Sequence, residues 1–311
     1  MANTESDTRN MIETAPTSAV SLRLKLINLI AVILPFAGFV AAMVLLWGIA
    51  FSWIHLVILA VMYLATAVGI TVGYHRLFTH RSFKTSKPVA AVLAVLGSMA
   101  VEGPLLHWVG SHRKHHQHSD REEDPHSPHV HGSGLWSMIR GLYHAHLGWL
   151  FQSNPRALTR YTLDLRRDRV LRWVSRLFPL WVVVGLLIPA ALGGLLTLSW
   201  TGALLGFLWG GLVRVFLVHH VTWSINSVCH IWGARPYDCH DESRNNVIFG
   251  VLALGEGWHN NHHAFPTSAR HGLRWWQIDV SYCIIWAMSK VGLASDVRIP
   301  SRDRIRDRRL A

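Results

Sequence analysis

The chain has 311 residues, of which 50% are hydrophobic and only 15% are charged. A soluble domain usually carries about 25% charged residues, so this composition argues against an ordinary soluble protein. The net charge is +12, yet no separate basic domain is present that would bind nucleic acid. The three cysteines, Cys229, Cys239 and Cys283, lack CxxC spacing and predict free thiols on a reducing face.

Four long apolar segments explain the low charge, and only Arg214 interrupts them. They are residues 27–48, 51–72, 178–198 and 202–222. Each is long enough to cross a bilayer core, which needs about 20 apolar residues. Four such runs argue against the alternative of buried helices in a large soluble protein.

The positions of Lys and Arg predict the topology. The joins near Ala50 and Ser199 carry no basic residue, whereas the amino-terminal tail, residues 76–176 and the carboxy-terminal region hold nearly all of them. The positive-inside rule then places both termini and the middle segment in the cytoplasm. The apolar segment Val89–Val101 is too short to cross, so we expect it to be re-entrant or buried.

We therefore expect an all-α integral membrane protein with four transmembrane helices and a cytoplasmic helical cap. Residues 21–297 are predicted to form a single domain, with the cap built from residues 73–177 and 223–297. Residues 1–20 are polar and predicted to be disordered. Residues 298–311 are predicted to be a solvated, partly disordered basic tail near anionic lipid. Residues 140–151 and 161–176 are predicted to be amphipathic helices at the membrane surface.

Two groups of three histidines share the spacing i, i+3, i+4. They are His112, His115 and His116, in a helix predicted over 105–118, and His259, His262 and His263, in a helix predicted to end at 264–266. This spacing places three imidazoles within about 100° of a helix face. Imidazole is a favoured ligand for iron, zinc and copper, so each group predicts metal binding.

His75 and His80 lie five residues apart at the end of the second span. That spacing is about 140° around an α-helix, so they can share one site only if the helix ends or turns between them. The remaining histidines are expected to be structural, some of them as partners of ligands. They include His55, His107, His118, His126, His144, His146, His219, His220, His240 and His271.

The residues around these histidines are similar to those of the membrane fatty acyl desaturases, in the Δ9, stearoyl-CoA desaturase-like branch. The similarity covers about Gly73 to Phe265. The motifs that carry it are His75-Arg-Leu-Phe-Thr-His80, His112-Arg-Lys-His115-His116, Tyr143-His144-Ala-His-Leu-Gly148-Trp149, Trp223-Ser-Ile-Asn226-Ser-Val-Cys-His230, Arg235-Pro236-Tyr237-Asp238 and Gly255-Glu-Gly-Trp-His259-Asn-Asn-His262-His263. Ser111 replaces an acidic residue found before the second histidine box in animal relatives, which leaves the acyl carrier open.

The resemblance implies a di-iron centre in the cap, held by nine histidines and by Asn226 through water. The implied ligands are His75, His80, His112, His115, His116, His230, His259, His262 and His263. His230 and Asn226 enter only through the resemblance. It implies an O2-dependent enzyme that introduces a cis double bond, at Δ9, into a saturated acyl chain carried on CoA or in a lipid. No catalytic residue beyond the metal ligands is implied.

The chemistry and the sequence together predict external electrons. Zinc has no redox chemistry, so the reaction needs iron and O2. The chain contains no GxGxxG motif and no cysteine set for an iron–sulfur cluster. A separate ferredoxin-, flavodoxin- or cytochrome-like donor is therefore expected at the basic cytoplasmic face. Basic residues expected near CoA or lipid phosphates are Arg76, Arg81, Lys84, Arg140 and Arg235.

Two other functions use similar histidines. A membrane hydroxylase or alkane mono-oxygenase would insert oxygen, and the ligand count alone does not separate it from a desaturase. A metal transporter would place ionisable residues in the middle of its spans, whereas most histidines here lie outside them.

Overall fold

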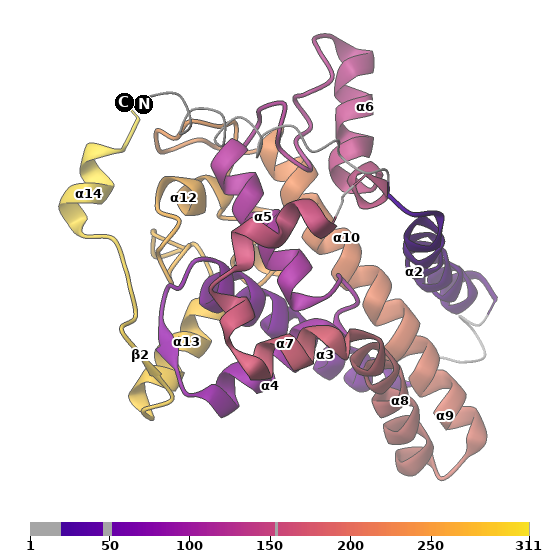
Figure 1. The fold of residues 1–311 in the computed structure, drawn as a ribbon. Coiled ribbons are helices and arrows are strands. Elements are labelled where there is room, and N and C mark those ends of the chain that lie inside the picture. Colours follow the sequence, from indigo (N-terminus) through magenta and orange to yellow (C-terminus); the bar gives the residue numbers. More distant parts are fainter. Residues whose placement is uncertain (1–19, 46–51, 153–154, 311) are drawn as a thin grey trace, which may run out of the picture.

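The computed structural model describes residues 20–45, 52–152 and 155–310, and its elements are almost entirely helical (Figure 1). In this described part the strands are β1 (Lys84–Thr85) and β2 (Ala294–Ser295), which form one short antiparallel pair. The prediction of an all-α protein is confirmed. The predicted disorder of residues 1–20 falls almost wholly outside the described residues.

Four helices are long and apolar enough to cross a membrane, which confirms the predicted number of spans. They are Leu22–Val44, Trp53–Thr79, Phe178–Thr197 and Trp200–His230. The first span comprises α2 (Leu22–Val40) and the π-helix η1 (Ala41–Leu45), and the second comprises α3 (Trp53–Val68) and the π-helix η2 (Gly69–Thr79). The third span is α8 (Phe178–Thr197). The fourth comprises α9 (Trp200–Gly206), the π-helix η6 (Phe207–Val213), α10 (Arg214–Ser227) and the 3-10 helix η7 (Val228–His230).

The second and fourth helices continue past the predicted ends at residues 72 and 222. Their last turns are buried by protein, as at Tyr74 and Trp223, so they do not need lipid around them. By contrast, apolar side chains such as Ile30, Val61 and Leu187 are exposed on the outer faces of the spans, where acyl chains would cover them.

The helix α4 (Lys87–Met99) is the short apolar segment between the second span and the cap. It packs closely against η2, because a Cβ atom at Gly69 would lie 2.1 Å from the backbone nitrogen of Gly97. The chain then returns through α5 (Leu105–His118). The expectation that this segment is too short to be a fifth span is confirmed.

The cap helices differ from the predicted amphipathic pair. Residues 140–151 are divided between α6 (Leu135–His146) and the 3-10 helix η3 (Gly148–Phe151). Within 161–176, α7 (Arg169–Arg176) starts where Asp168 accepts hydrogen bonds from the backbone nitrogens of Val170 and Leu171. The remaining short helices are η4 (Pro155–Thr162), η5 (Leu165–Arg167), α11 (Val247–Leu252), α12 (His259–Ala264), α13 (Val280–Lys290) and α14 (Arg302–Asp307).

The carboxy-terminal tail is ordered as far as Leu310, contrary to the predicted partial disorder. Ser301 caps α14, and the Leu310 backbone nitrogen donates to the Pro236 carbonyl at 3.0 Å. The Asp238 backbone nitrogen donates to the Arg308 carbonyl at 2.8 Å. Backbone pairing with the loop that follows the fourth span thus holds a segment whose composition alone indicated a solvated chain.

Candidate metal centre

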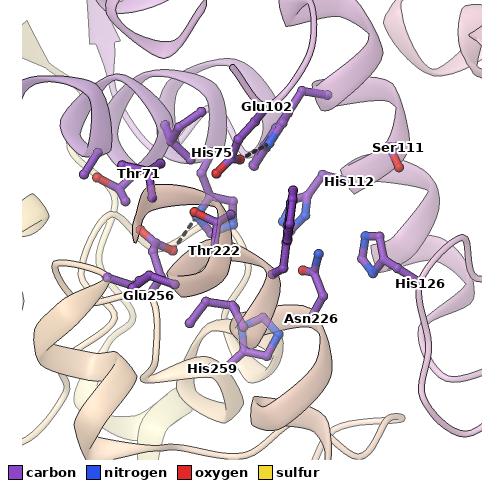
Figure 2. A pocket seen from close by; sticks show the side chains of 18 of the residues that line it. Thr71, His75, Glu102, Ser111, His112, His126, Thr222, Asn226, Glu256 and His259 are labelled. Carbon is purple, nitrogen blue, oxygen red and sulfur yellow. Dashed lines mark hydrogen bonds and ion pairs between the residues drawn. The ribbon is translucent and has the colours of Figure 1, made fainter. Parts of the chain in front are cut away.

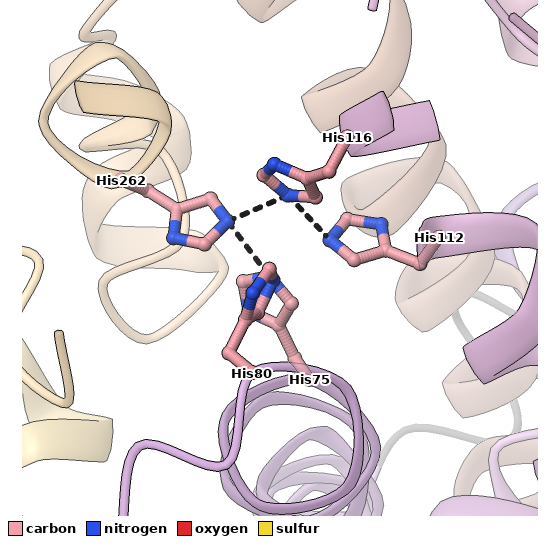
Figure 3. Close-up of side chains that lie close together, drawn as sticks. All are labelled: His75, His80, His112, His116 and His262. Carbon is pink, nitrogen blue, oxygen red and sulfur yellow. Dashed lines mark hydrogen bonds between the residues drawn. The ribbon is translucent and has the colours of Figure 1, made fainter. Parts of the chain in front are cut away.

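Four elements from distant parts of the chain bring the predicted histidines together: η2, α5, η7 and α12. The first cluster comprises five histidines whose possible ligand atoms lie within 4.8 Å of one another (Figure 3). Its members are His75, His80, His112, His116 and His262. The second cluster meets the same distance limit and comprises His115, His230, His259 and His263.

The two helices α5 and α12 each serve both clusters. In α5, His112 and His116 belong to the first cluster and His115 to the second. In α12 the division is reversed, because His262 belongs to the first cluster and its neighbour His263 to the second. The three histidines on each of these helices are therefore divided between two clusters. An arc of about 100° is wide enough to face two points at once.

The π-helix η2 explains how His75 and His80 share the first cluster. The His80 backbone nitrogen donates to the His75 carbonyl at 3.1 Å, an i to i+5 hydrogen bond. Such winding stacks residues five apart along the helix, and π segments occur mostly at functional sites. The helix also ends at Thr79, so the expected end between the two histidines is confirmed.

The spacing inside the first cluster suits a metal ion. The Nε2 atoms of neighbouring histidines are separated by 3.1 Å for His75–His262, 3.1 Å for His112–His116 and 2.9 Å for His116–His262. With metal–nitrogen bonds of about 2.1 Å, two ligands at a right angle lie about 3.0 Å apart, and two tetrahedral ligands about 3.4 Å apart. Nitrogen atoms at these separations could be ligands of a single metal ion.

Unpaired ring nitrogens mark the second cluster. His115 and His263 each place Nδ1 against a carboxylate, Asp124 at 2.9 Å and Asp241 at 2.7 Å. Because Nδ1 donates its proton there, Nε2 carries the lone pair. Both Nε2 atoms are buried without a hydrogen-bond partner in the described part of the chain. A metal ion would satisfy them.

Carboxylates orient histidines of both clusters. Besides Asp124 and Asp241, Glu256 lies 2.6 Å from His75 Nδ1, and Asp120 lies 2.8 Å from His230 Nδ1. Burial by itself would raise the pKa of Asp124, but the adjacent His115 holds that pKa well below its ordinary range. These carboxylates therefore stay ionised at neutral pH and fix the ring orientation, as acid–histidine–metal arrangements do.

Three of the clustered imidazoles, those of His112, His116 and His259, are held neutral, the form that binds metal. Burial, reinforced by neighbouring histidines, lowers the pKa of His112, His116 and His259 well below the ordinary value. In water such a group would be partly protonated near pH 6.5. The protein thus removes proton competition for the ligand atoms.

Two histidines assigned structural roles from sequence lie beside the clusters. The His271 ring is 4.5 Å from that of His262, and the His126 ring is 4.4 Å from that of His115. His271 Nδ1 also lies 3.3 Å from Glu256, which is consistent with the expectation that some of these histidines are partners of ligands. Their sequence contexts carry no repeated spacing, so only the fold reveals these positions.

The basic residues expected to meet phosphates are mostly committed elsewhere. Arg76 is fully buried, with Nη1 2.8 Å from Asp279 and Nη2 3.2 Å from Glu256, so it cannot contact a phosphate. The others lie near the surface, where Arg81 pairs with Asp164, Lys84 with Asp296 and Arg235 with Glu242, and where Arg140 lies over the Trp136 ring.

A cavity adjoins both clusters (Figure 2). His75, His112 and His259 form part of its wall, and Asn226 lies between them and His126. Much of the remaining wall is apolar, from the second and fourth spans: Ala67, Ile70, Val218, Val221 and Ile225. An apolar cavity with a few convergent polar groups is the usual form of a small-molecule site.

The arrangement defines a membrane protein with a candidate two-metal centre beside an apolar cavity. The chain belongs to the fatty acid desaturase family, whose model matches residues 51–280. The family named from the histidine motifs is thereby confirmed, and with it the assignment to the oxidoreductases.

Curated relatives include three with different acyl carriers in their names. The chain is 44% identical over 281 residues to a hex-5-enoyl-[acyl-carrier protein] acetylenase of Moorena producens, covering 90% of this chain and 88% of that one. It is 38% identical to an sn-1 stearoyl-lipid 9-desaturase of Anabaena variabilis, covering 81% of this chain and 87% of that one. It is 40% identical to an acyl-CoA C20 Delta5-desaturase of Anemone leveillei, covering 81% of this chain and 76% of that one.

Replacing Asp241 with asparagine is expected to lower metal affinity about 10- to 100-fold, the usual effect of losing a partner of a ligating histidine. Asparagine keeps the size of the side chain but removes the charge that fixes His263. Metal titration of the purified protein measures the change. Asp303→Asn, on the exposed face of α14, is the control, and equal affinities in the two variants would contradict the prediction.

Proposed function

We propose that the chain is an O2-dependent fatty acyl desaturase that introduces a cis double bond at Δ9 into a saturated acyl chain. The observation that carries the proposal is the apolar cavity, since His75 and His112 of the first cluster and His259 of the second all line it. An acyl chain in this cavity would lie against both clusters. We assign the nine histidines as iron ligands, with Asn226 bonded through water.

The residues divide the work of the reaction. Two bound irons, with O2, would supply the oxidising power needed to remove hydrogen from an unactivated methylene pair. The histidines hold that centre, and Asp120, Asp124, Asp241 and Glu256 keep the rings oriented. The apolar wall binds the hydrocarbon and excludes water from the site.

The acyl carrier is proposed to be CoA or a glycerolipid. The names of the Anabaena and Anemone relatives support these two carriers, and the Anabaena name also supports Δ9. A second candidate comes from the Moorena relative, an acetylenase. On that alternative the chain would convert an existing double bond into a triple bond, so a monounsaturated substrate would give an acetylenic product.

We propose a separate electron donor of the ferredoxin, flavodoxin or cytochrome type. On α7, Arg169, Arg172 and Arg176 line a groove with Trp173, and none of them forms an ion pair in the described part of the chain. A basic surface of this kind would attract an acidic donor.

Expression in a membrane host with a competent donor, followed by gas chromatography of the fatty acids, tests the function. The expected result is a new cis monoene together with about two irons per chain, as a di-iron centre requires. A hydroxylated product would instead identify the chain as a hydroxylase. Unchanged lipids despite bound iron, or one zinc without iron, would refute the proposal.

We also propose that residues 21–297 form one domain whose cap, with both termini, faces the cytoplasm. Cys283 on α13 is exposed, whereas Cys229 is buried and Cys239 half-buried. In a Cys239→Ser background, a membrane-impermeant maleimide is expected to label Cys283 in inside-out vesicles and not in intact cells. Cys283→Ser is the control. Labelling of Cys283 in intact cells would indicate the opposite orientation and contradict the proposal.

A further inference from the structure

The turn between α4 and α5 is strained and lies against the cavity. Val101 has φ 67° and Gly103 has φ 105°. A β-branched residue in the left-handed region is a genuine outlier, and it persists only where surrounding structure holds it. Glu102, which lies between Val101 and Gly103, lines the cavity (Figure 2).

Two buried side chains from the fourth span hold this turn. The Arg214 guanidinium donates from Nη1 to the Met99 carbonyl at 2.6 Å and from Nη2 to the Gly185 carbonyl at 2.9 Å. His219 Nε2 donates to the Val101 carbonyl at 3.0 Å. Arg214 is fully buried, and no carboxylate pairs with it in the described ranges.

These contacts satisfy backbone carbonyls at the buried end of α4. The carbonyls at the end of a helix have no partner within that helix, and burying them unpaired is costly. The end of α4 lies beside the third span, because a Cβ atom at Gly185 would meet the Met99 Cβ at 3.0 Å. A cation is also the favoured charge at a helix carboxyl end. Arg214 and His219 thus replace the water that would satisfy an exposed turn.

The turn connects these residues to the metal centre. Trp108 Nε1 donates to Glu102 Oε2 at 2.9 Å, and the Trp108 ring stacks on the His112 ring with centroids 5.1 Å apart. Burial raises the pKa of Glu102 to about 7. A shift of the turn would therefore move both Glu102 and Trp108 within the cavity wall.

We propose that Arg214 and His219 are positioning residues that determine which carbon pair of the acyl chain faces the metal clusters. They act through the turn, which places Glu102 and Trp108 against the chain. The proposal rests on the proposed acyl-modifying function. It predicts an effect on the position of the product bond in addition to any effect on yield.

The test compares His219→Leu with His55→Leu. Both histidines are buried in spans and bond a backbone carbonyl through Nε2, in the case of His55 that of Gly202 at 3.1 Å. His55 lies 20 residues before His75 and does not line the cavity. The variants are expressed in the same host, and the carbon position of the introduced double bond or hydroxyl is determined by mass spectrometry of derivatised fatty acids.

His219→Leu is expected to raise the proportion of positional isomers about fivefold, as loss of one neutral hydrogen bond would allow. His219→Gln, which can still donate to the Val101 carbonyl, should restore the wild-type distribution. His55→Leu should lower yield at most. Arg214→Lys, which keeps the charge but loses the fork, provides a second variant with the same expected shift.

An unchanged isomer distribution in His219→Leu and Arg214→Lys would overturn the proposal, as would an equal shift in His55→Leu. Hydrogen exchange of the purified protein gives a readout independent of activity. Backbone amides of residues 99–105 should exchange faster in His219→Leu and not in His55→Leu. If the wild type makes no product, the function fails, while unchanged exchange in His219→Leu would separately sink the inference.

Discussion

Replacing His262 with alanine is expected to remove one of two bound irons and to abolish product formation. Replacing its neighbour His263 is expected to remove the other iron. His262 Nε2 lies 3.1 Å from His75 Nε2 and 2.9 Å from His116 Nε2, in the first cluster, whereas His263 belongs to the second. Metal analysis should therefore give about one iron per chain for each variant, because each keeps one complete ligand set.

The exposed His131, which lies outside both clusters, provides the control, and His131→Ala should retain both irons and full activity. Loss of both irons in either variant would show that the clusters do not fill independently. Retention of both would remove these histidines from the ligand set. Iron spectroscopy of the two variants should differ, since the remaining ion has different ligands in each.

Replacing Arg76 with methionine is expected to destabilise the protein by about 3–5 kcal/mol, the usual effect of breaking a buried ion pair from one side. Arg76 lies between Asp279 and Glu256 and also donates to the Ala269 carbonyl at 2.8 Å. Without it, two buried carboxylates lose their counter-charge. A lower melting temperature of the metal-free protein in detergent measures the effect.

Arg81→Met is the matched control, because Arg81 pairs with Asp164 but is 62% exposed. Exposed pairs contribute about 0–1 kcal/mol, so this variant should melt close to the wild type. Equal melting temperatures for the two variants would contradict the interpretation of Arg76 as a buried structural cation. The comparison also separates folding from any role in binding phosphate.

The sequence was sufficient for the features that depend on composition and spacing. Four spans followed from length and absence of charge, and the ligand-bearing helices over 105–118 and 259–264 followed from repeated histidine spacing. His230 was predicted from the family motifs, because a single histidine without a repeated spacing does not by itself predict a metal ligand. The structure brings all nine histidines into two clusters, and their role as iron ligands stays a prediction.

Features set by tertiary packing were not predictable. The π winding at His75 and His80 has no sequence signal, because residues five apart give no regular α pattern. Arg76 reads as an interfacial cation, but two carboxylates from distant segments bury it. Asp120 and Asp124 lie in a short acidic segment after α5 that carries no motif, yet they hold His230 and His115 of the second cluster. In each case the deciding partner lies far away along the chain or in an irregular segment.

The division of neighbouring histidines between two clusters has a mechanical consequence. Because α5 and α12 each contribute to both clusters, a hinge motion that separated them would pull both clusters apart at once. We therefore expect the two clusters and the helices that carry them to move as one rigid body. We then expect an acyl chain to enter through side-chain rotations and small displacements in the cavity wall, without separation of α5 from α12.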